Sequence, residues 1–159
     1  MVERGCKMDE CARHQEAGDR GLRSLSESEC WGLLGSHDLG RIAFLVDDWP
    51  QVFPVNYSVG EGAVLFRSAP GAKATHGPGS RACFEIDGWD DTAGIGWSVM
   101  VQGTIRDITE AADEQALGLR QLSPHPAAPG IRHLLLALVA SRVSGRRFGG
   151  VGIVRPLPF

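Results

Sequence analysis

A loop at residues 67–73 combines side chains that together can hold a phosphate group. The stretch FRSAPGAKAT lies between two apolar runs and contains Arg67, Ser68 and Lys73. A guanidinium at a strand end can donate to two phosphate oxygens, a hydroxyl adds a further donor, and a lysine adds a point charge. Pro70 and Gly71 let the backbone bend around an anion. The same residues also suit a solvated turn, so their types and spacing leave both interpretations open.

The loop does not match the motifs that bind nucleoside triphosphates or hydrolyse esters. A Walker loop needs glycine directly before its lysine and at a fixed earlier position, where this chain has Ala72 and Arg67. The sequence contains no GxGxxG, and no GxSxG surrounds a serine. Ser68, His76 and Asp87 therefore lack the setting of a hydrolytic triad, and no catalytic nucleophile is assigned.

Four cysteines raise the question of a metal site. Cys30 and Cys83 stand among apolar residues, which is typical of buried thiols. Cys6, Cys11 and His14 could ligate zinc, but a structural zinc site usually has four ligands at closer spacing. We therefore expect free thiols and no metal.

Two helices are expected to flank the strands that carry the loop. In the segment 25–40, Ser26 is followed three residues later by Glu29, which is the spacing of a capping box. Residues 109–122 have a helical composition with acids near the start, and Thr109 is the expected cap. These helices would cover the two ends of the structure formed by the strands between them.

Between the helices the pattern becomes β. Two apolar runs around residues 47–50 predict a hairpin with a turn of four or five residues. Further strands are expected from residue 63, from residue 81 and over 96–108. Residues 133–142 fit either a helix, from their leucines and alanines, or a strand, from the β-branched residues that follow. Consecutive strands with short turns predict a mainly β fold, a small antiparallel barrel with helices over its openings.

Composition limits the class of protein. The 159 residues suffice for one domain, which we place at 25–159 after a flexible tail at 1–24. The net charge is -3, so no overall basic field favours nucleic acid, and no apolar stretch has the length of a membrane span. The polar leader has no apolar signal core, so a cytoplasmic location is expected.

Several short motifs occur along the chain in an order that is similar to the order in a known protein family. The series is Gly-Arg (40–41), Pro-Val-Asn-Tyr (54–57), Phe-Arg-Ser-Ala (66–69) with lysine at 73, Glu-Ile-Asp (85–87) and Gly-Trp-Ser-Val (96–99). Over residues 25–110 the chain resembles the pyridoxamine 5'-phosphate oxidase-like, FMN-binding split-barrel proteins, in particular their small actinobacterial-type members. SGRRF at 144–148 is similar to the closing strand of that group.

The resemblance implies a six-stranded antiparallel split β-barrel that forms a homodimer with FMN at the subunit interface. It implies that the flavin phosphate is held by Arg67, Ser68 and Lys73. The isoalloxazine would lie along Pro54, Val55 and Asn56, with Asn56 able to hydrogen-bond the ring edge. The long strand that completes the pocket would contribute Trp97, Ser98 and Gln102.

The function implied by the resemblance is FMN-dependent oxidoreduction. Hydride would pass between the flavin N5 and an unidentified small substrate, with NAD(P)H as a possible electron donor, so no protein nucleophile is needed. Another reading is a split barrel that binds flavin, haem or a deazaflavin without turnover, and a third is a structural dimer with an empty pocket. The basic residues that grip a pyridoxal phosphate-type substrate are not evident, which argues against pyridoxamine phosphate oxidase activity itself. Residues 123–141 also diverge from the usual polar stretch of the group.

Overall fold

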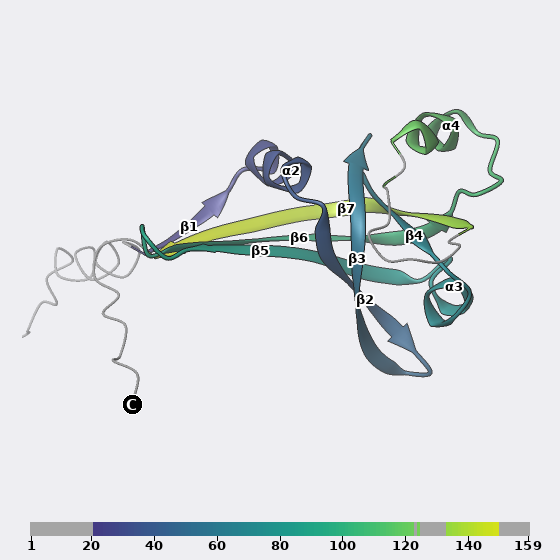
Figure 1. Cartoon of the computed structure of the whole chain (residues 1–159), viewed down its shortest axis with the longest axis horizontal. Helices are drawn as coiled ribbons and strands as arrows, with labels where there is room; N and C mark the ends of the chain where they lie inside the picture. Colours follow the sequence, from purple (N-terminus) through teal and green to yellow (C-terminus); the bar gives the residue numbers. More distant parts are fainter. Residues whose placement is uncertain (1–20, 123, 125–132, 150–159) are drawn as a thin grey trace, which may run out of the picture.

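The computed structural model describes residues 21–122, 124 and 133–149, which form an antiparallel sheet rolled into a barrel (Figure 1). In chain order the elements are β1 (Leu22–Leu25), α2 (Glu27–Gly35), β2 (Leu39–Val46), β3 (Trp49–Gly60), β4 (Ala63–Ser68), α3 (Ala72–His76), β5 (Arg81–Asp90), β6 (Ile95–Asp107), α4 (Glu114–Gln121) and β7 (Leu134–Gly149). The expected mainly β class is confirmed.

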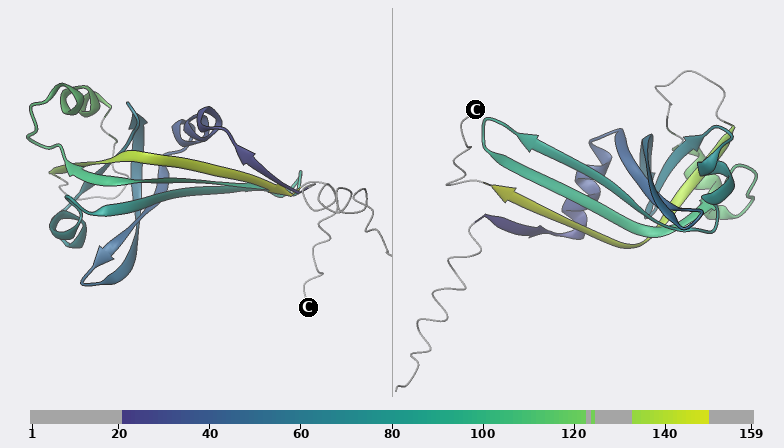
Figure 2. Two further views of the ribbon diagram at one scale, coloured as in Figure 1. Left: turned by 180° about the vertical axis from the view of Figure 1, so that it is seen from behind. Right: turned by 90° about the horizontal axis from the view of Figure 1, so that it is seen from below.

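Six strands form a closed circuit and the seventh extends it. The order is β1-β7-β4-β3-β2-β5-β6, and pairing of β6 with β7 closes the circuit. The long β7 pairs with β4 over residues 134–139 and with β1 over residues 145–148. Residues 22–24, which the sequence placed in the tail, therefore belong to β1, while residues 1–20 lie outside the described part. The long strands β5, β6 and β7 run well beyond the barrel toward β1 (Figures 1 and 2).

The turn between β2 and β3 is tighter than expected. It consists of Asp47 and Asp48 alone, because β3 already begins at Trp49. Both aspartates have positive φ, 50° and 63°, as a two-residue hairpin turn with the twist of the flanking strands requires. The predicted turn of four or five residues is wrong because Pro50 is tolerated inside the ladder, opposite Leu45.

The ambiguous segment 133–142 is a strand. Its apolar residues 135–138 are all buried, since β7 lies between β4 and β6 and has packed side chains on both of its faces. A strand that is covered on both faces has a continuous apolar run instead of an alternating one. Tertiary contacts thus override the helical preference of leucine and alanine.

Two apolar clusters stabilise the molecule. The larger cluster fills the barrel and includes Phe66, Phe84 and Ile42. The smaller one lies on the opposite face of β4 and β7, under α4, and includes Leu65, Leu119 and Leu135 among others. Alternate residues of β4 and β7 therefore serve two different cores, which explains why almost all of β4 is buried.

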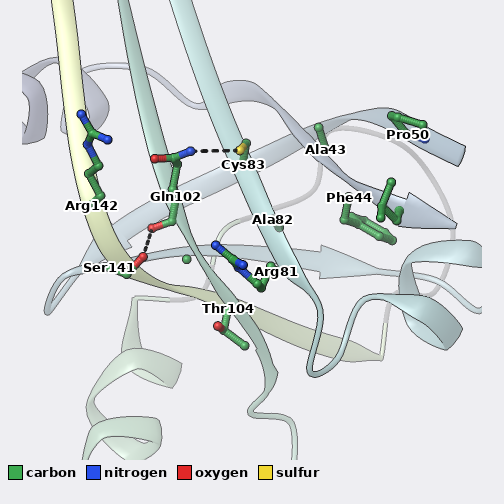
Figure 3. Close-up of a pocket in the computed structure, with 12 residues that line it drawn as sticks. Ala43, Phe44, Pro50, Arg81, Ala82, Cys83, Gln102, Thr104, Ser141 and Arg142 are labelled. Carbon is green, nitrogen blue, oxygen red and sulfur yellow. Dashed lines mark hydrogen bonds between the residues drawn. The ribbon is translucent and has the colours of Figure 1, made fainter. Parts of the chain in front are cut away.

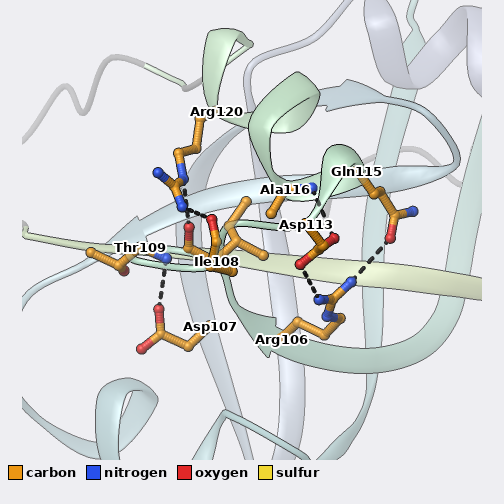
Figure 4. A network of polar contacts seen from close by, with 9 residues as sticks. Arg106, Asp107, Ile108, Thr109, Asp113, Gln115, Ala116 and Arg120 are labelled. Carbon is orange, nitrogen blue, oxygen red and sulfur yellow. Dashed lines mark hydrogen bonds and ion pairs between the residues drawn. The ribbon is translucent and has the colours of Figure 1, made fainter.

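Polar contacts attach α4 over the second cluster (Figure 4). Asp113 caps the helix by accepting from the N–H of Ala116, and Arg106 donates to Asp113 at 3.0 Å. The predicted cap, Thr109, is too early in the chain, because residues before Asp113 are needed to cross from β6 to the helix. Its hydroxyl instead accepts from the N–H of Leu135 at 2.9 Å and ties the crossing to β7.

At the other end, α2 has the predicted capping box. Ser26 accepts from the N–H of Glu29, whose carboxylate accepts from the Ser26 N–H at 2.8 Å. The helix packs on the long strands through its buried residues Cys30 and Leu34. No helix within the described ranges is long and apolar enough to cross a membrane. Cys6, Cys11 and His14 lie outside those ranges.

Candidate functional site

The phosphate loop of the sequence forms a small hollow at the end of β4. The backbone leaves β4 at Ser68, bends through Pro70 and Gly71, and enters α3 at Ala72. Residues 68–73 and Phe53 of β3 line a hollow of about 140 Å³. Lys73 carries its ammonium 4.9 Å from the centre of the Phe53 ring, within the range of a cation–π contact. The loop thus closes on a cavity beside β3.

The donors of this hollow suit an anion the size of a phosphate group. Its volume equals roughly four to five water molecules at about 30 Å³ each. Ser68 is fully buried, and its hydroxyl donates to the carbonyl of Ala69 at 2.8 Å. The Ser68 hydroxyl would have to rotate to donate to a ligand. The structure therefore brings Ser68 and Lys73 together at one hollow.

Arg67 faces away from this hollow. Successive side chains of a strand point to opposite faces, and Ser68 shares the barrel face with Phe66. Arg67 consequently lies on the other face, opposite Leu135, where Leu65 and Leu135 belong to the cluster under α4. The structure does not bring Arg67 together with Ser68 and Lys73 at the hollow.

The predicted ring-binding residues of β3 divide between its two faces. Val55 is 3% exposed and belongs to the barrel core, so only its backbone can meet a ligand outside. Pro54 and Asn56 point outward, and Asn56 donates to the carbonyl of Asp38 at 3.3 Å. Pro54 pairs with β2 on one side, while β4 pairs with β3 only from Tyr57 onward. Within the described residues β3 is thus an edge at Pro54, as its missing N–H predicts.

The predicted residues of β6 are divided in the same way. Trp97 belongs to the inner side, where its ring lies 4.9 Å from that of His37. Ser98 and Gln102 are on the outer face of the sheet, and Gln102 donates to the sulfur of Cys83 at 3.9 Å. Cys83 is half-buried, in contrast to the fully buried Cys30, so the expectation of two buried thiols holds for Cys30 alone.

Strand register joins the outward residues into one surface, which we call the outer face. Across β3, β2, β5, β6 and β7 the paired positions are Pro54–Arg41, Arg41–Glu85, Glu85–Met100 and Met100–Ser144, with neighbouring rows through Asn56–Leu39 and Cys83–Gln102–Arg142. Four of the predicted site residues, Pro54, Asn56, Ser98 and Gln102, lie on this face. The outer face is therefore the surface that the sequence-based candidates share.

Sequence reasoning missed a large hollow of the outer face (Figure 3). It measures about 570 Å³ and is lined by residues of β2, β3, β5, β6 and β7, among them Phe44, Arg81, Gln102 and Arg142. A neighbouring hollow of about 470 Å³ shares Gln102 and Arg142. Phe44 reaches the hollow only from the inner side of the sheet, since it is buried in the barrel core and packs at 5.3 Å on Phe53. No motif marks Arg81 or Arg142, because only the pairing of β5, β6 and β7 puts them on one surface.

Charge on the outer face is unevenly distributed. Arg41 bridges two acids, with its guanidinium 3.1 Å from Asp87 and 3.6 Å from Glu85. Burial raises the pKa of Glu85, and the nearby Asp87 raises it further, against the opposing effect of Arg41. Among the described residues no cluster of three or more His, Cys, Asp or Glu side chains could hold a metal ion. The outer face thus carries carboxylates beside Arg41 as well as hydroxyls, amides and other cations.

Comparison with known proteins places the chain in a family. The sequence profile described as pyridoxamine 5'-phosphate oxidase matches residues 26–147. An uncharacterized protein of Mycobacterium tuberculosis is 31% identical over 134 residues, which cover 80% of this chain and 86% of the relative.

Two solved structures share both sequence and fold with the chain. A FAD binding protein from Mycobacterium smegmatis is 33% identical with a TM-score of 0.60, over 80% of this chain and 98% of that one. A Corynebacterium glutamicum protein, provisionally assigned as a pyridoxamine 5'-phosphate oxidase, is 28% identical with a TM-score of 0.69, over 84% of this chain and 98% of that one. The resemblance noted in the sequence is confirmed: the chain belongs to the pyridoxamine 5'-phosphate oxidase family.

Proposed function

We propose that this protein binds a flavin, FMN in the first instance, and acts as an oxidoreductase on a small substrate that remains to be identified. The observation that carries the proposal is the hollow at the end of β4, where the buried Ser68 and the cation of Lys73 border a space of phosphate size. A flavin phosphate there would receive a charge-assisted contact from Lys73 and a hydrogen bond from Ser68.

The flavin ring would extend from this hollow along the edge of β3. Pro54 and the backbone of Val55 offer a flat apolar surface there, and the amide of Asn56 can reach a ring edge. Ser98 and Gln102 lie on the outer face but several strands away, so they would contribute from a second copy of the chain. Trp97 faces inward, and we assign it to packing against His37, just after the end of α2.

The chemistry would come from the flavin, which can accept and return a hydride when it is bound. The protein would contribute orientation and charge, and this agrees with the lack of a recognisable protein nucleophile in the sequence. Arg67 enters the proposal only through the sequence prediction, because strand alternation directs it toward the cluster under α4. NAD(P)H as the electron donor and a cytoplasmic location stay predictions.

A second candidate function is flavin storage or delivery without turnover. The solved structure from Mycobacterium smegmatis that is 33% identical is that of a FAD binding protein. By this likeness the present chain could take FAD in place of FMN, and haem or a deazaflavin are further options within the same reading. With a flavin, both functions would use the same phosphate hollow, so they would differ only in what happens after binding.

We also propose a homodimer in which the outer faces of two copies meet. Leu39, Leu45, Val52 and Met100 point outward from this face and are between 39% and 61% exposed. Exposed apolar side chains gathered on one sheet face are typical of an interface. Such a dimer would also bring Ser98 of one copy toward the phosphate loop of the other.

The test is flavin binding by the purified full chain and by the variant Lys73→Ala. Loss of one charge-assisted contact, about 1.5–3 kcal/mol, should weaken FMN binding by about ten- to a hundredfold. Arg67→Ala, a cation six positions away on the other face of β4, is the matched control and should retain FMN affinity. Titration of the apoprotein with FMN and with FAD, followed by flavin fluorescence, gives both the affinity and the preferred flavin.

Three outcomes test the location of the phosphate site and distinguish an oxidoreductase from a flavin storage protein. If Lys73→Ala binds FMN as tightly as the unchanged protein, the phosphate assignment is wrong. If Arg67→Ala loses affinity and Lys73→Ala does not, the sequence-based choice of Arg67 is right and the hollow is not the phosphate site. Bleaching of the bound flavin by NADH or NADPH, with recovery in air, would support an oxidoreductase over a storage protein.

A further inference from the structure

We propose that the large hollow of the outer face is a second binding site, which takes a small organic anion through Arg81 and Arg142. The ligand class is a molecule with one phosphate or carboxylate group attached to an apolar, ring-sized body. This site is separate from the hollow that we assign to the flavin phosphate, and the inference does not rest on flavin binding.

Strand register puts the two arginines on either side of Gln102. Gln102 pairs with Cys83 on β5 and with Arg142 on β7, so these three residues form one row across the sheet. Arg81 lies two residues before Cys83 and pairs with Thr104, which makes it a diagonal neighbour of Gln102. Diagonal neighbours lie about 7–8 Å apart, within reach of arginine side chains. Figure 3 shows Arg81 extending from β5 toward β6, with Gln102 between Arg142 and Cys83.

A bulge in β7 shapes this side of the hollow. Gln102 pairs with Arg142 but the next residue, Gly103, pairs with Ala140, so Ser141 is an extra residue without a partner in the ladder. Ser141 donates its hydroxyl to the carbonyl of Gln102 at 3.0 Å. In a regular strand Ser141 and Arg142 would point to opposite faces, whereas here both border the hollow. Bulges commonly re-aim side chains beside binding sites.

Within the described residues, no acidic side chain forms an ion pair with Arg81 or Arg142. The four ion pairs found there involve Arg23, Arg41 and Arg106, but neither Arg81 nor Arg142. Both arginines are exposed, and hydroxyls of Thr104 and Ser141 stand beside them on the rim. Guanidinium groups bind phosphates and carboxylates through paired N–H donors. The polar end of the hollow is therefore suited to one anionic group.

The opposite end of the hollow is apolar. Leu45 and Pro50 line it with outward side chains, and the floor between the two ends includes the small residues Ala43 and Gly103. Phe44 and Ala82 border the hollow only from the inner side of the sheet, where both belong to the barrel core. Small side chains in the floor leave the depth that makes the hollow about 570 Å³, which lies within the range of pockets for small organic ligands. An anion with a flat apolar body would contact both ends at once.

The experiment titrates the full-length protein with phenyl phosphate and with benzoate, followed by calorimetry and by NMR signals of the arginine side chains. Benzyl alcohol is the neutral probe of similar size. We expect at least one of the two anions to bind, and Arg81→Ala and Arg142→Ala each to weaken that binding by about tenfold or more. The comparison of the two anions shows whether phosphate or carboxylate is the preferred group.

Two control variants make the result specific. Arg147→Ala removes an exposed arginine five residues along the same strand that borders neither hollow of the outer face, and it should bind the probe normally. Lys73→Ala should also bind the probe normally while it loses flavin, which keeps this inference and the proposed function independently testable. Thermal melting of every variant confirms that it is folded.

Three results would overturn the inference. The first is that benzyl alcohol binds as tightly as both anions, and the second is that Arg81→Ala and Arg142→Ala leave anion affinity unchanged. The third is that neither anion binds. A change in the sedimentation behaviour of the double variant would then show that the arginines serve contacts with a second copy of the chain.

Discussion

Glu29 shows how a single residue in the first turn of α2 anchors an element. Its carboxylate accepts from the N–H of Ser26 at 2.8 Å and from the guanidinium of Arg23 at 2.9 Å. Hydrogen bonding to Arg23, followed by that to Ser26, lowers the pKa of Glu29 to about 2, from an ordinary value of 4.5. The contact with Arg23 also links α2 to β1, the strand that extends the barrel.

The lowered pKa of Glu29 predicts a loss of stability in acid. A carboxyl group with a depressed pKa in the folded state stabilises the fold above its unfolded pKa, and this contribution disappears as pH falls through the folded pKa. Between pH 4.5 and about 2 the free energy of unfolding should therefore fall more for the unchanged protein than for Glu29→Gln.

Urea unfolding at pH 6 and at pH 3 measures this difference. Glu27→Gln, which removes the other acid of the same helical turn, is the control and should keep the acid sensitivity. An equal loss of stability in the unchanged protein and in Glu29→Gln would show that the capping box contributes nothing that depends on pH.

At the scale of elements, the pairing of β6 with β7 decides what the outer face can bind. Gly103 lies at the bulge, and a Cβ built at this position would collide with the backbone carbonyl of Val139. Backbone atoms cannot give way as a flexible side chain can. Glycine is therefore required here by the close approach of the two strands, and it also keeps the floor of the hollow low.

Gly103→Ala is expected to destabilise the protein by about 1–3 kcal/mol, the usual cost of overpacking. Gly32→Ala, in the exposed middle of α2, meets no atom within 4 Å of the new Cβ and should stabilise the protein by about 0.5–1 kcal/mol. Chemical denaturation of both variants tests the pair. A neutral Gly103→Ala would mean that β6 and β7 can separate at the bulge without cost.

At the scale of the whole molecule, the proposed homodimer interface and the proposed anion site both lie on the outer face. An antiparallel sheet with one face in water usually presents polar residues there, yet this face exposes Leu39, Leu45 and Val52. A second copy that covers them would enclose the arginine-lined hollow between subunits. The proposed dimer and the proposed anion site are thus linked through shared strands.

Leu45→Asp is expected to shift the protein from dimer to monomer, because a charge would be buried in the proposed interface. Leu117→Asp changes a leucine of similar exposure on α4, away from the outer face, and should leave the association state as it was. Sedimentation velocity over a range of concentrations measures both. A protein that is already monomeric at micromolar concentration would contradict the dimer.

The sequence by itself determined the local features of this protein. The capping box at Ser26 and the strand from Ala63 both follow from residue types within a few positions of each other. The order of short motifs also sufficed to identify the family, since it depends on residue types alone.

Only the tertiary structure decided which distant residues share a surface. That β7 is a strand depends on β4 and β6 packing beside it, and that Arg81, Gln102 and Arg142 border one hollow depends on the register of three strands and on one bulge. Likewise, Arg67 and Ser68 are neighbours in the sequence but lie on opposite faces of β4. The sequence does not reveal that each of these faces packs against a different core. Pairing between strands links positions far apart in the chain, and a one-residue shift in register reverses the face of every side chain, so local patterns cannot determine it.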